Sequence, residues 1–492
     1  MNSLLKSPYK NIFIIGLLCY IITAFFSEGY HHSDEHFQIL EFCNYKLGNT
    51  PSNDLAWEFQ YSVRSALLPT IAFIIIKAFN LIGIYNPFTY TLILRLFSAL
   101  LSWFIVCKIC LLLIKDFSSA TGKRIFLLMS LFLWFIPYIS VRFSAENWSA
   151  ITFLSSIYLI LLSTNEKTQR NYIQLSLAGL LIGFSFFFRF QTGFAIVGLC
   201  LWISFVKKVH LKGLLMLIFS GMLSISICVI LDYWFYGKLV LTPFNYFYTQ
   251  VIENVNSNWG DSFPWWYYFK FFIIDAIPPL SVLLLVFFFI GIYKKPWNVF
   301  TWCMIPFLII HFIYAHKEMR FMFPIVFGFI YLTAIGIDSF IVKEKYKQVG
   351  RVLFILIVII NLPPLIFRMF MPAQEAISYY KFLYTYSSKK EMVLLCKQRN
   401  AYELAGLNVN FYKSPSVKCF VLNDNQEISN YLNKNKLDSA YLFEKTFQSD
   451  TQLIGYKKET IYCFYPKWLL GIDLNKWQSR TWIWNIEKLR KQ

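Results

Sequence analysis

The sequence predicts a mainly α-helical protein that crosses a membrane many times and carries a small soluble α/β domain at its C-terminal end. Hydrophobic residues make up 57% of the 492 residues and charged residues only 15%, whereas a soluble protein has about 25% charged residues. Long apolar stretches run from Asn11 to about Met371, and an ordinary water-soluble composition follows from Pro372 onward. We therefore exclude a secreted, cytosolic or disordered protein.

About eleven apolar stretches have the length of a membrane-spanning helix, which needs about 20 mostly apolar residues. The first stretch lacks an A-x-A-like cleavage site and many more follow it, so we expect it to stay as an anchor. The expected spans are 11–26, 88–110, 123–140, 149–163, 172–189, 193–206, 212–231, 267–291, 297–314, 321–341 and 350–371.

One further apolar segment, Ser65–Gly83, decides the side of every later loop. If it does not cross, the inner loops hold twice as many Lys and Arg residues as the outer loops, and if it crosses the ratio reverses. Because basic residues gather in cytoplasmic loops, we expect a re-entrant or surface helix in the first outer loop, bent at Pro69. An ordinary span is the alternative. The non-crossing interpretation predicts a cytoplasmic N-terminus.

The C-terminal part follows the spacing of an α/β domain. Val417–Leu422 and Ala440–Phe443 have the pattern of strands, and the stretch 426–435 between them has that of a helix. We therefore expect a transmembrane domain over 1–371 and a soluble extracytoplasmic domain over 372–492.

The net charge of +19 does not indicate a nucleic-acid partner, because the basic residues are spread over many short loops.

Six of the ten cysteines lie in apolar runs and are expected to be buried. Cys396, Cys419 and Cys463 could form one disulfide, but an odd number gives no unique pair. No metal-spaced set is present, so no metal or cofactor is expected, although metal dependence stays open at the acidic cluster described next.

A dense charged cluster, Tyr30–Phe42, follows the first expected span. Asp34 and Glu35 lie between His32 and His36. A general base at the membrane surface is one interpretation. The other is a helix start with Ser33 as its N-cap and the two carboxylates favoured by the helix dipole. The two interpretations are compatible.

Two further clusters lie on the same predicted side. The loop Asp232–Pro264 and the residues just after it are rich in aromatic side chains, which favours an interfacial belt or a surface for stacking sugar rings. The segment Ala315–Phe321 places four ionisable groups between apolar spans. Such charges indicate a functional site, here for phosphate, or else a short solvated loop. Arg142 and Arg189, at span ends, could be snorkelling arginines.

Together these clusters resemble the GT-C superfamily of polytopic glycosyltransferases, and within it mannosyltransferase family 22. The pattern H-P-D-E-x-x-Q is similar to His32, Asp34, Glu35 and Gln38, with Ser33 in place of Pro. W-E-x…R-S…P resembles Trp57, Glu58, Arg64, Ser65 and Pro69. D-x-x-F-Y-G-x-x-x-x-T-P-x-N-F resembles Asp232, Phe235, Tyr236, Gly237, Thr242, Pro243 and Asn245, with Tyr246 for Phe. H-K-E-x-R-F is met by His316, Lys317, Glu318, Arg320 and Phe321.

The resemblance implies transfer of a sugar, in this family mannose, from a polyprenyl-phosphate donor to a hydroxyl of a glycan or glycolipid at the outer face of the membrane, with inversion. It implies Asp34 as the base, supported or replaced by Glu35. Phosphate ligands are then His316, Lys317 and Arg320. Substrate contacts are His32, Gln38, Arg64, Asp232, Tyr236, Asn245 and Glu318.

The sequence departs from the family where the acceptor would be selected. The pattern G-x-H-P-W becomes Gly260–Trp265 without its His, and no C-H-S-T-P-like segment is present. The sugar, the acceptor and the linkage therefore stay open, as does a GT-C enzyme that uses another sugar. A lipid or solute transporter is the alternative from another class, but the charges lie at one edge and no repeat relates two halves. The composition favours a bacterial source.

Overall fold

The computed structural model describes most of the chain. The residues outside the description are 1, 166–169, 254–261, 344–346, 375, 389–390, 405, 445–452, 454, 473 and 482. The expected aromatic loop therefore falls partly outside it, including Gly260 and Asp261.

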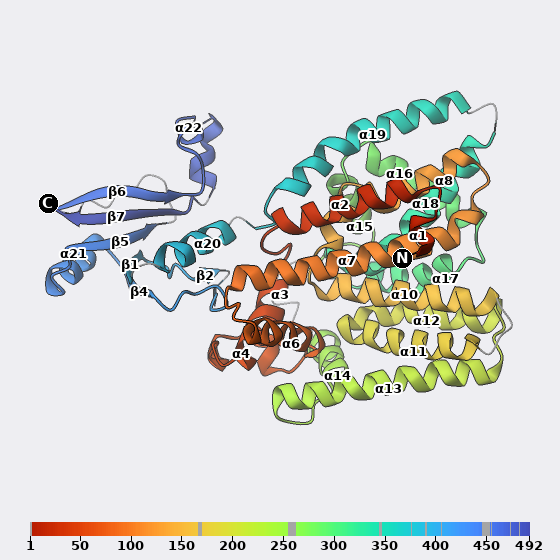
Figure 1. Cartoon of the computed structure of the whole chain (residues 1–492), viewed down its shortest axis with the longest axis horizontal. Helices are drawn as coiled ribbons and strands as arrows, with labels where there is room; N and C mark the ends of the chain where they lie inside the picture. The colour runs from red at the N-terminus through yellow and green to blue at the C-terminus, as the bar shows by residue number, and fades with distance from the viewer. Residues whose placement is uncertain are drawn as a thin grey trace. The chain divides into compact units, whose positions relative to one another are not determined.

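The chain forms two compact units, and each unit is assembled from three segments. The helical unit comprises Met1–Ser27, Trp57–Lys77 and Leu92–Met371. The mixed-sheet unit comprises Glu28–Ala56, Ala78–Thr91 and Pro372–Gln492 (Figure 1). The segment that carries Asp34 and Glu35 thus folds with the C-terminal part of the chain.

Helices make up the first unit, and α6 and α7 each extend into the second. Their bounds are α1 Asn2–Leu5, α2 Lys10–Phe26, α5 Trp57–Gln60, α6 Leu67–Leu81, α7 Pro87–Leu113, α8 Ala120–Phe132, α9 Phe135–Ser140, α10 Ala145–Asn165, α11 Arg170–Phe188, α12 Gly193–Leu201, α13 Leu211–Tyr236, α14 Thr242–Phe247, α15 Tyr267–Asp275, α16 Leu280–Lys294, α17 Val299–Ile313, α18 Val326–Ile341 and α19 Lys347–Phe370.

The expected fold class is confirmed. Within the described residues, five helices have the length and apolar composition of a membrane span, and α16 and α17 form a sixth candidate bent by 120°. Shorter apolar helices are Lys10–Phe26, Leu67–Leu81, Phe190–Val206 and Phe354–Phe370.

Two expected continuous helices are broken in the structure. The stretch 267–291 divides into α15 and α16 at Pro278 and Pro279, because proline cannot donate to the helical ladder. The stretch 123–140 divides after Phe132. There the Asn361 side chain accepts a hydrogen bond from Trp134 N and donates one to Phe132 O, both at 2.8 Å.

Small residues let helices of this unit approach closely, as in other membrane bundles. Figure 1 shows α10, α11 and α13 side by side. A Cβ atom added to Gly183 of α11 would lie 2.0 Å from the Ser224 hydroxyl of α13. At Gly291 of α16 it would lie 1.9 Å from the Leu332 carbonyl of α18. Neither position can take a larger side chain without moving a helix.

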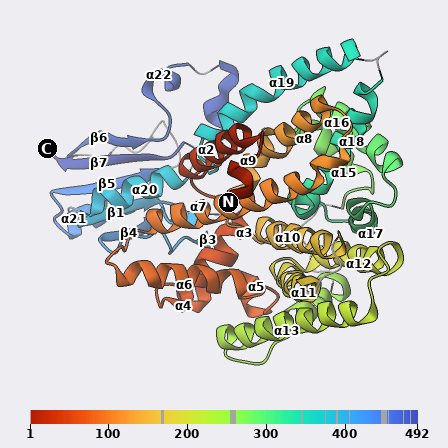
Figure 2. The same cartoon turned by 45° about the vertical axis from the view of Figure 1, so that its right-hand side comes forward.

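The mixed-sheet unit contains a five-stranded sheet in the order β4-β1-β5-β7-β6. Strands β4, β1 and β5 are parallel, and β7 and β6 continue the sheet antiparallel; Figure 2 shows β7 between β5 and β6. The bounds are β1 Met392–Lys397, β2 Glu403–Leu404, β3 Leu407–Asn408, β4 Val417–Leu422, β5 Ser439–Glu444, β6 Tyr456–Cys463, β7 Asn485–Lys491, α3 Ser33–Glu35, α4 Glu41–Lys46, α20 Ala376–Ser387, α21 Asn425–Lys434 and α22 Lys467–Leu470.

The expected strand, helix and strand are β4, α21 and β5. Ile428 and Leu432 of α21 pack on Leu395, Leu442 and Leu489 of the sheet. All ten cysteines are free thiols, so the disulfide considered for this part of the chain is not formed.

Candidate active site

The carboxylates Asp34 and Glu35 lie in the short helix α3 of the mixed-sheet unit. The N-cap is His32, not Ser33 as expected. His32 Nδ1 accepts a hydrogen bond from Asp34 N at 3.2 Å and lies 3.2 Å from Asp34 Oδ1. Glu35 Oε1 accepts from His31 N at 3.2 Å. The Asp34 side chain is 22% exposed, so it can meet a substrate.

A buried network lies directly after these carboxylates. The residues His36–Leu40 form one turn of π-helix, a local widening that is frequent at functional sites. His36 Nε2 lies 2.9 Å from Glu41 Oε1, and both side chains are 0% exposed. Glu41 also accepts hydrogen bonds from Thr50 Oγ1 at 2.7 Å and from Phe411 N at 2.9 Å.

This network was not predicted from the sequence. The one signal available was a carboxylate between the apolar residues Leu40 and Phe42, since an isolated charge in an apolar run needs a partner. The ring of His36 stacks on Tyr412 with centroids 5.4 Å apart. Both aromatic and polar contacts therefore join the segment after Asp34 to the loop that follows β3. Gln38, on the same π-helical turn, is buried.

A second group of motif residues lies in the helical unit and braces the segment that precedes α6. Asp232 Oδ1 accepts a hydrogen bond from Ala66 N at 2.7 Å, and Asp232 Oδ2 accepts one from Thr242 Oγ1 at 2.6 Å. Tyr236 donates its hydroxyl to the Arg64 carbonyl at 2.6 Å. Asp232 thus binds the backbone at Ala66 and the side chain of Thr242, and Tyr236 binds the backbone at Arg64.

Asn245 makes the same kind of contact, since its side-chain amide donates to Ser62 O at 3.2 Å. The guanidinium of Arg64 lies 3.8 Å from Glu58 Oε1 and 5.6 Å from the ring centre of Tyr246. The segment that Asp232, Tyr236 and Asn245 hold is therefore the one that presents Arg64.

The third group is a buried ion-pair network in the helical unit. Glu146 Oε1 lies 3.1 Å from Arg189 Nη1 and 3.3 Å from Arg320 Nη1. Arg320 also donates from Nε and Nη2 to the two oxygens of Glu318, a bidentate pair. His316 Nε2 lies 2.9 Å from Glu318 Oε1. His316, Glu318 and Arg320, predicted as phosphate and substrate contacts, are thus brought together.

Glu146 and Arg189, which were not predicted as site residues, are positioned by the ends of two helices. Glu146 lies in the first turn of α10 and Arg189 directly after α11, so each charge is favoured by its helix dipole. The snorkelling interpretation of Arg189 was wrong, because its side chain is 6% exposed and paired with Glu146. Arg142 is also buried and donates to the Ser27 carbonyl and hydroxyl. In the sequence, Arg142, Glu146 and Arg189 could have been noticed as charged residues at the ends of apolar spans, where a charge indicates a functional site.

Lys317 has a separate position in this segment. Its ammonium donates to the carbonyls of His311 at 3.0 Å and Phe312 at 2.9 Å, and also to that of Tyr314. It thereby closes the C-terminal end of α17, where a cation is favoured. The ammonium also lies 5.4 Å from the ring centre of Tyr268. Burial lowers the pKa of Lys317 from its usual value.

The described residues contain no group of three or more His, Cys, Asp or Glu side chains that could hold a metal ion. An apolar cavity of about 300 Å³ lies between α15, α16, α17 and α18. Met319 and Met322, on either side of Arg320 in the chain, belong to its lining.

The fold and these clusters define a membrane protein of many helices, with charged networks at helix ends and a mixed-sheet unit. The profile of the "Alg9-like mannosyltransferase family" matches residues 11–400. The chain therefore belongs to this family of membrane mannosyltransferases.

Among its relatives, "GPI mannosyltransferase 3" of Candida albicans is 27% identical over 358 residues, which are 72% of this chain and 69% of the relative. "GPI alpha-1,2-mannosyltransferase 3" of Homo sapiens is 26% identical over 326 residues, 65% of this chain and 56% of the relative. "Probable Dol-P-Man:Man(7)GlcNAc(2)-PP-Dol alpha-1,6-mannosyltransferase" of Schizosaccharomyces pombe is 24% identical over 298 residues, 60% of this chain and 52% of the relative. The match thus spans little more than half of the last two.

Among solved structures, the crystal structure of ArnT from Cupriavidus metallidurans bound to undecaprenyl phosphate has the same fold. The two chains are 11% identical, with 98% of each covered and a TM-score of 0.54.

Proposed function

We propose that this protein transfers mannose from a polyprenyl-phosphate carrier to a hydroxyl of a glycan or glycolipid. The buried network around Arg320 carries the proposal. Arg189 and Arg320 pair with the carboxylates of Glu146 and Glu318, and the Lys317 ammonium, bound to carbonyls at the end of α17, adds a third cation in the same segment as Arg320. Such an excess of positive charge, desolvated by burial, favours the binding of an anion.

The anion we assign to this network is the phosphate of the donor. Arg320 already holds the Glu318 carboxylate as a bidentate fork, and a phosphate fits the same two donors. The Glu318 side chain is 24% exposed, so it can move into water when phosphate arrives. His316 would then donate to the phosphate. Lys317 would contribute its charge, because its N–H groups are bound to carbonyls.

The chain of the donor would lie in the apolar cavity beside Arg320. The cavity borders Met319 and Met322, and it offers hydrocarbon surface next to the cations. A polyprenyl-phosphate sugar matches this arrangement, because its phosphate would lie at the cations and its isoprenoid chain on the hydrocarbon surface. This support is independent of the motif resemblance.

The transfer we propose is a displacement with inversion. The acceptor oxygen attacks the anomeric carbon and passes its proton to Asp34, with Glu35 as supporting or alternative base. The bond from that carbon to the phosphate oxygen breaks, and its electron pair leaves with the phosphate, stabilised by Arg320 and His316. The assignment of Asp34 and Arg320 to one reaction rests on the family motifs.

The other motif residues divide into two roles in this proposal. His32 and Gln38 contact substrate beside Asp34. Arg64 contacts substrate, and Asp232, Tyr236 and Asn245 position it through the backbone that they bind. Relatives that act on GPI and on lipid-linked mannosyl glycans support an acceptor of that chemistry. A bacterial source is proposed from composition alone.

We propose that the active site and residues 372–492 face the extracytoplasmic side. The distribution of basic loops supports this side. Helix α6 has 15 residues and so measures about 22 Å, shorter than the ~30 Å core of a bilayer. Cysteines introduced at Gln60 and Asn86 should therefore react with an impermeant reagent from the same side; labelling from opposite sides would contradict the proposal.

The test of the function is a transfer assay with the purified full chain. Labelled mannose, glucose and arabinose, each on polyprenyl phosphate, are offered with lipid-linked mannosyl acceptors. We expect a mannosylated product of inverted configuration. Lipid movement across proteoliposomes without product from any donor would favour the transporter instead, and product from another sugar donor alone would favour the second GT-C interpretation.

A further inference from the structure

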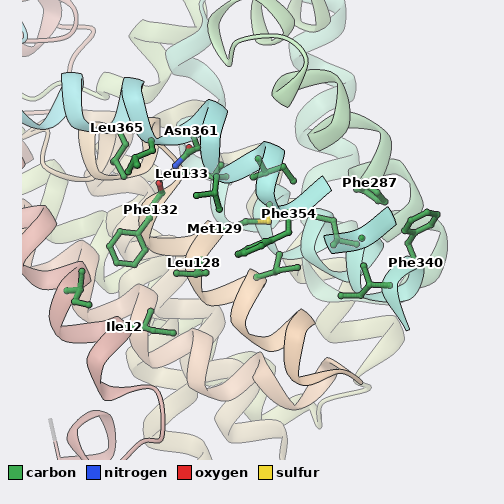
Figure 3. A pocket seen from close by; sticks show the side chains of 18 residues that line it. Ile12, Leu128, Met129, Phe132, Leu133, Phe287, Phe340, Phe354, Asn361 and Leu365 are labelled. Atoms are coloured by element: carbon green, nitrogen blue, oxygen red, sulfur yellow. Dashed lines mark hydrogen bonds between the residues drawn. The ribbon is translucent and has the colours of Figure 1, made fainter. Parts of the chain in front are cut away.

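A second apolar cavity in the helical unit is not used by the proposed reaction. It has a volume of about 360 Å³ and lies between α2, α8, α18 and α19 (Figure 3). Its lining on α19 runs from Gly350 to Leu365, a distance of about 22 Å along the helix. Figure 3 shows Leu365 and Phe340 toward opposite ends of the lining side chains. The cavity is therefore long enough for an extended chain, and we call it the α19 groove.

The groove has almost no hydrogen-bonding capacity. Asn361 is the one amide among the lining side chains, and its oxygen and nitrogen are both bound to the backbone at the break between α8 and α9. A sugar or a peptide would leave its own polar groups without partners there. An apolar cavity of about 150 Å³ takes up benzene, so this one has room for a hydrocarbon chain.

One end of the groove is basic. Lys10 precedes the lining residue Ile12, Arg124 precedes Ile125, and Lys343 follows Ile341. Gly16 of α2 lies against Leu131 of α8, and Gly122 of α8 lies against Asp338 of α18, so the three cations lie toward the same end of these helices. All three side chains are exposed. The chemistry that fits is an acyl chain in the groove with an anionic group beside the cations.

This end is remote from the network around Arg320. Arg320 lies before the start of α18, whereas Ile337 and Ile341 reach the groove at the end of the same helix. The 16 residues of α18 separate the two regions by about 24 Å. In the topology proposed above, the basic end faces the cytoplasmic leaflet, where anionic lipids attract Lys and Arg.

We propose that the α19 groove is a binding site for an anionic phospholipid, with one acyl chain between α19 and α8 and the headgroup beside Lys10, Arg124 and Lys343. A hydrocarbon chain gains little on moving from the bilayer into an apolar groove, because lipid tails are as apolar as the lining. Selectivity must therefore come from the headgroup. A lipid bound there would contact α19 and the neighbouring helices α2, α8 and α18 at once.

The test is native mass spectrometry of the purified full chain with phosphatidylglycerol and phosphatidylcholine of identical acyl chains. We expect wild-type protein to retain phosphatidylglycerol with a preference on the order of tenfold. The triple variant Lys10→Gln, Arg124→Gln and Lys343→Gln should lose that preference. The matched control removes three exposed cations elsewhere, with Lys207→Gln, Lys208→Gln and Lys212→Gln, and should keep it.

Filling the groove separates chain binding from headgroup binding. Leu362→Trp should lower retention of both lipids, and Val358→Trp serves if that variant does not fold. Leu215→Trp, on exposed α13 surface, is the control and should retain lipid normally. Unchanged retention in the filled variant would overturn the proposal, as would a preference that the triple variant keeps. Loss of polyprenyl phosphate alone from the filled variant would assign the groove to the donor chain and likewise overturn it.

Discussion

His36 and Glu41 form a pair 2.9 Å apart in which neither side chain is exposed to solvent. The pair begins two residues after Asp34, and the same carboxylate accepts a hydrogen bond from Phe411 N. The segment that carries the proposed base is thereby fixed to the C-terminal part of the chain. An unpaired polar group costs free energy at this depth; Glu41 is the partner of His36 Nε2, while His36 Nδ1 is buried without a hydrogen bond in the described part of the chain.

We predict that Glu41→Ala loosens this segment strongly. The substitution removes the partner of His36 Nε2, Thr50 Oγ1 and Phe411 N together, and each unsatisfied buried group costs about 1–3 kcal/mol. Hydrogen exchange should therefore rise in residues 30–50 and around Phe411, with a lower unfolding temperature. Glu391→Ala is the control, because its pair with Lys418 is 77% and 60% exposed and such pairs contribute little. Equal effects of the two substitutions would contradict the buried role.

Asp34→Asn is expected to abolish transfer while the protein still inserts and binds donor. Asparagine has nearly the same shape but cannot accept a proton from the acceptor hydroxyl. A general base contributes about 10² to 10⁴-fold in rate, and kcat should fall by that range. Glu35→Gln is the comparison. If that variant is inactive and Asp34→Asn is active, Glu35 is the base; if both keep full activity, α3 has no catalytic carboxylate.

Arg320→Lys should raise the KM for the polyprenyl-phosphate donor and leave the acceptor KM little changed. Lysine keeps the charge, but an ammonium cannot reproduce the bidentate fork that Arg320 now makes with Glu318. Steady-state kinetics with each substrate varied in turn give the two constants. An unaltered donor KM would remove Arg320 from the phosphate site.

Lys317→Met tests the role of Lys317, whose ammonium donates hydrogen bonds to three backbone carbonyls at the end of α17. We expect a loss of thermal stability, because the end of α17 loses hydrogen bonds from a charged donor, each with a net contribution of about 1.5–3 kcal/mol. The donor KM should change less than in Arg320→Lys. The reverse order, with stability kept and donor binding lost, would show that the ammonium acts on the phosphate and not as a helix cap.

The sequence was informative where the physics is local. Apolar run lengths predicted most of the helices, and two short apolar runs with a mixed polar and apolar stretch between them predicted β4, α21 and β5. The break between α8 and α9 was not predicted, because Asn361, whose side chain binds the exposed backbone groups there, is more than 200 residues away in the chain. For the same reason spacing could not predict the bond between Glu41 and Phe411, 370 residues apart, or that between Glu146 and Arg320, 174 residues apart.

The motif residues show the same division. His316, Glu318 and Arg320 are near neighbours in sequence and do meet, as their spacing suggested. Asp232 and Asn245 were expected to contact substrate, and their described hydrogen bonds go to the side chains of Thr242 and Ser65 and to the backbone of residues 61–66. A motif alone does not distinguish a residue that touches substrate from one that holds the segment doing so.

The assembly of the mixed-sheet unit from segments far apart in the chain has a consequence for biosynthesis. Residues 28–56 leave the ribosome before Phe411, which follows more than 350 residues later. At about 5–20 residues per second that interval is on the order of half a minute. The nascent helices thus enter the bilayer before Glu41 can meet its backbone partner. The segment that carries the proposed base is therefore fixed only after Phe411 has been translated, and a chain terminated before Phe411 would insert without becoming active.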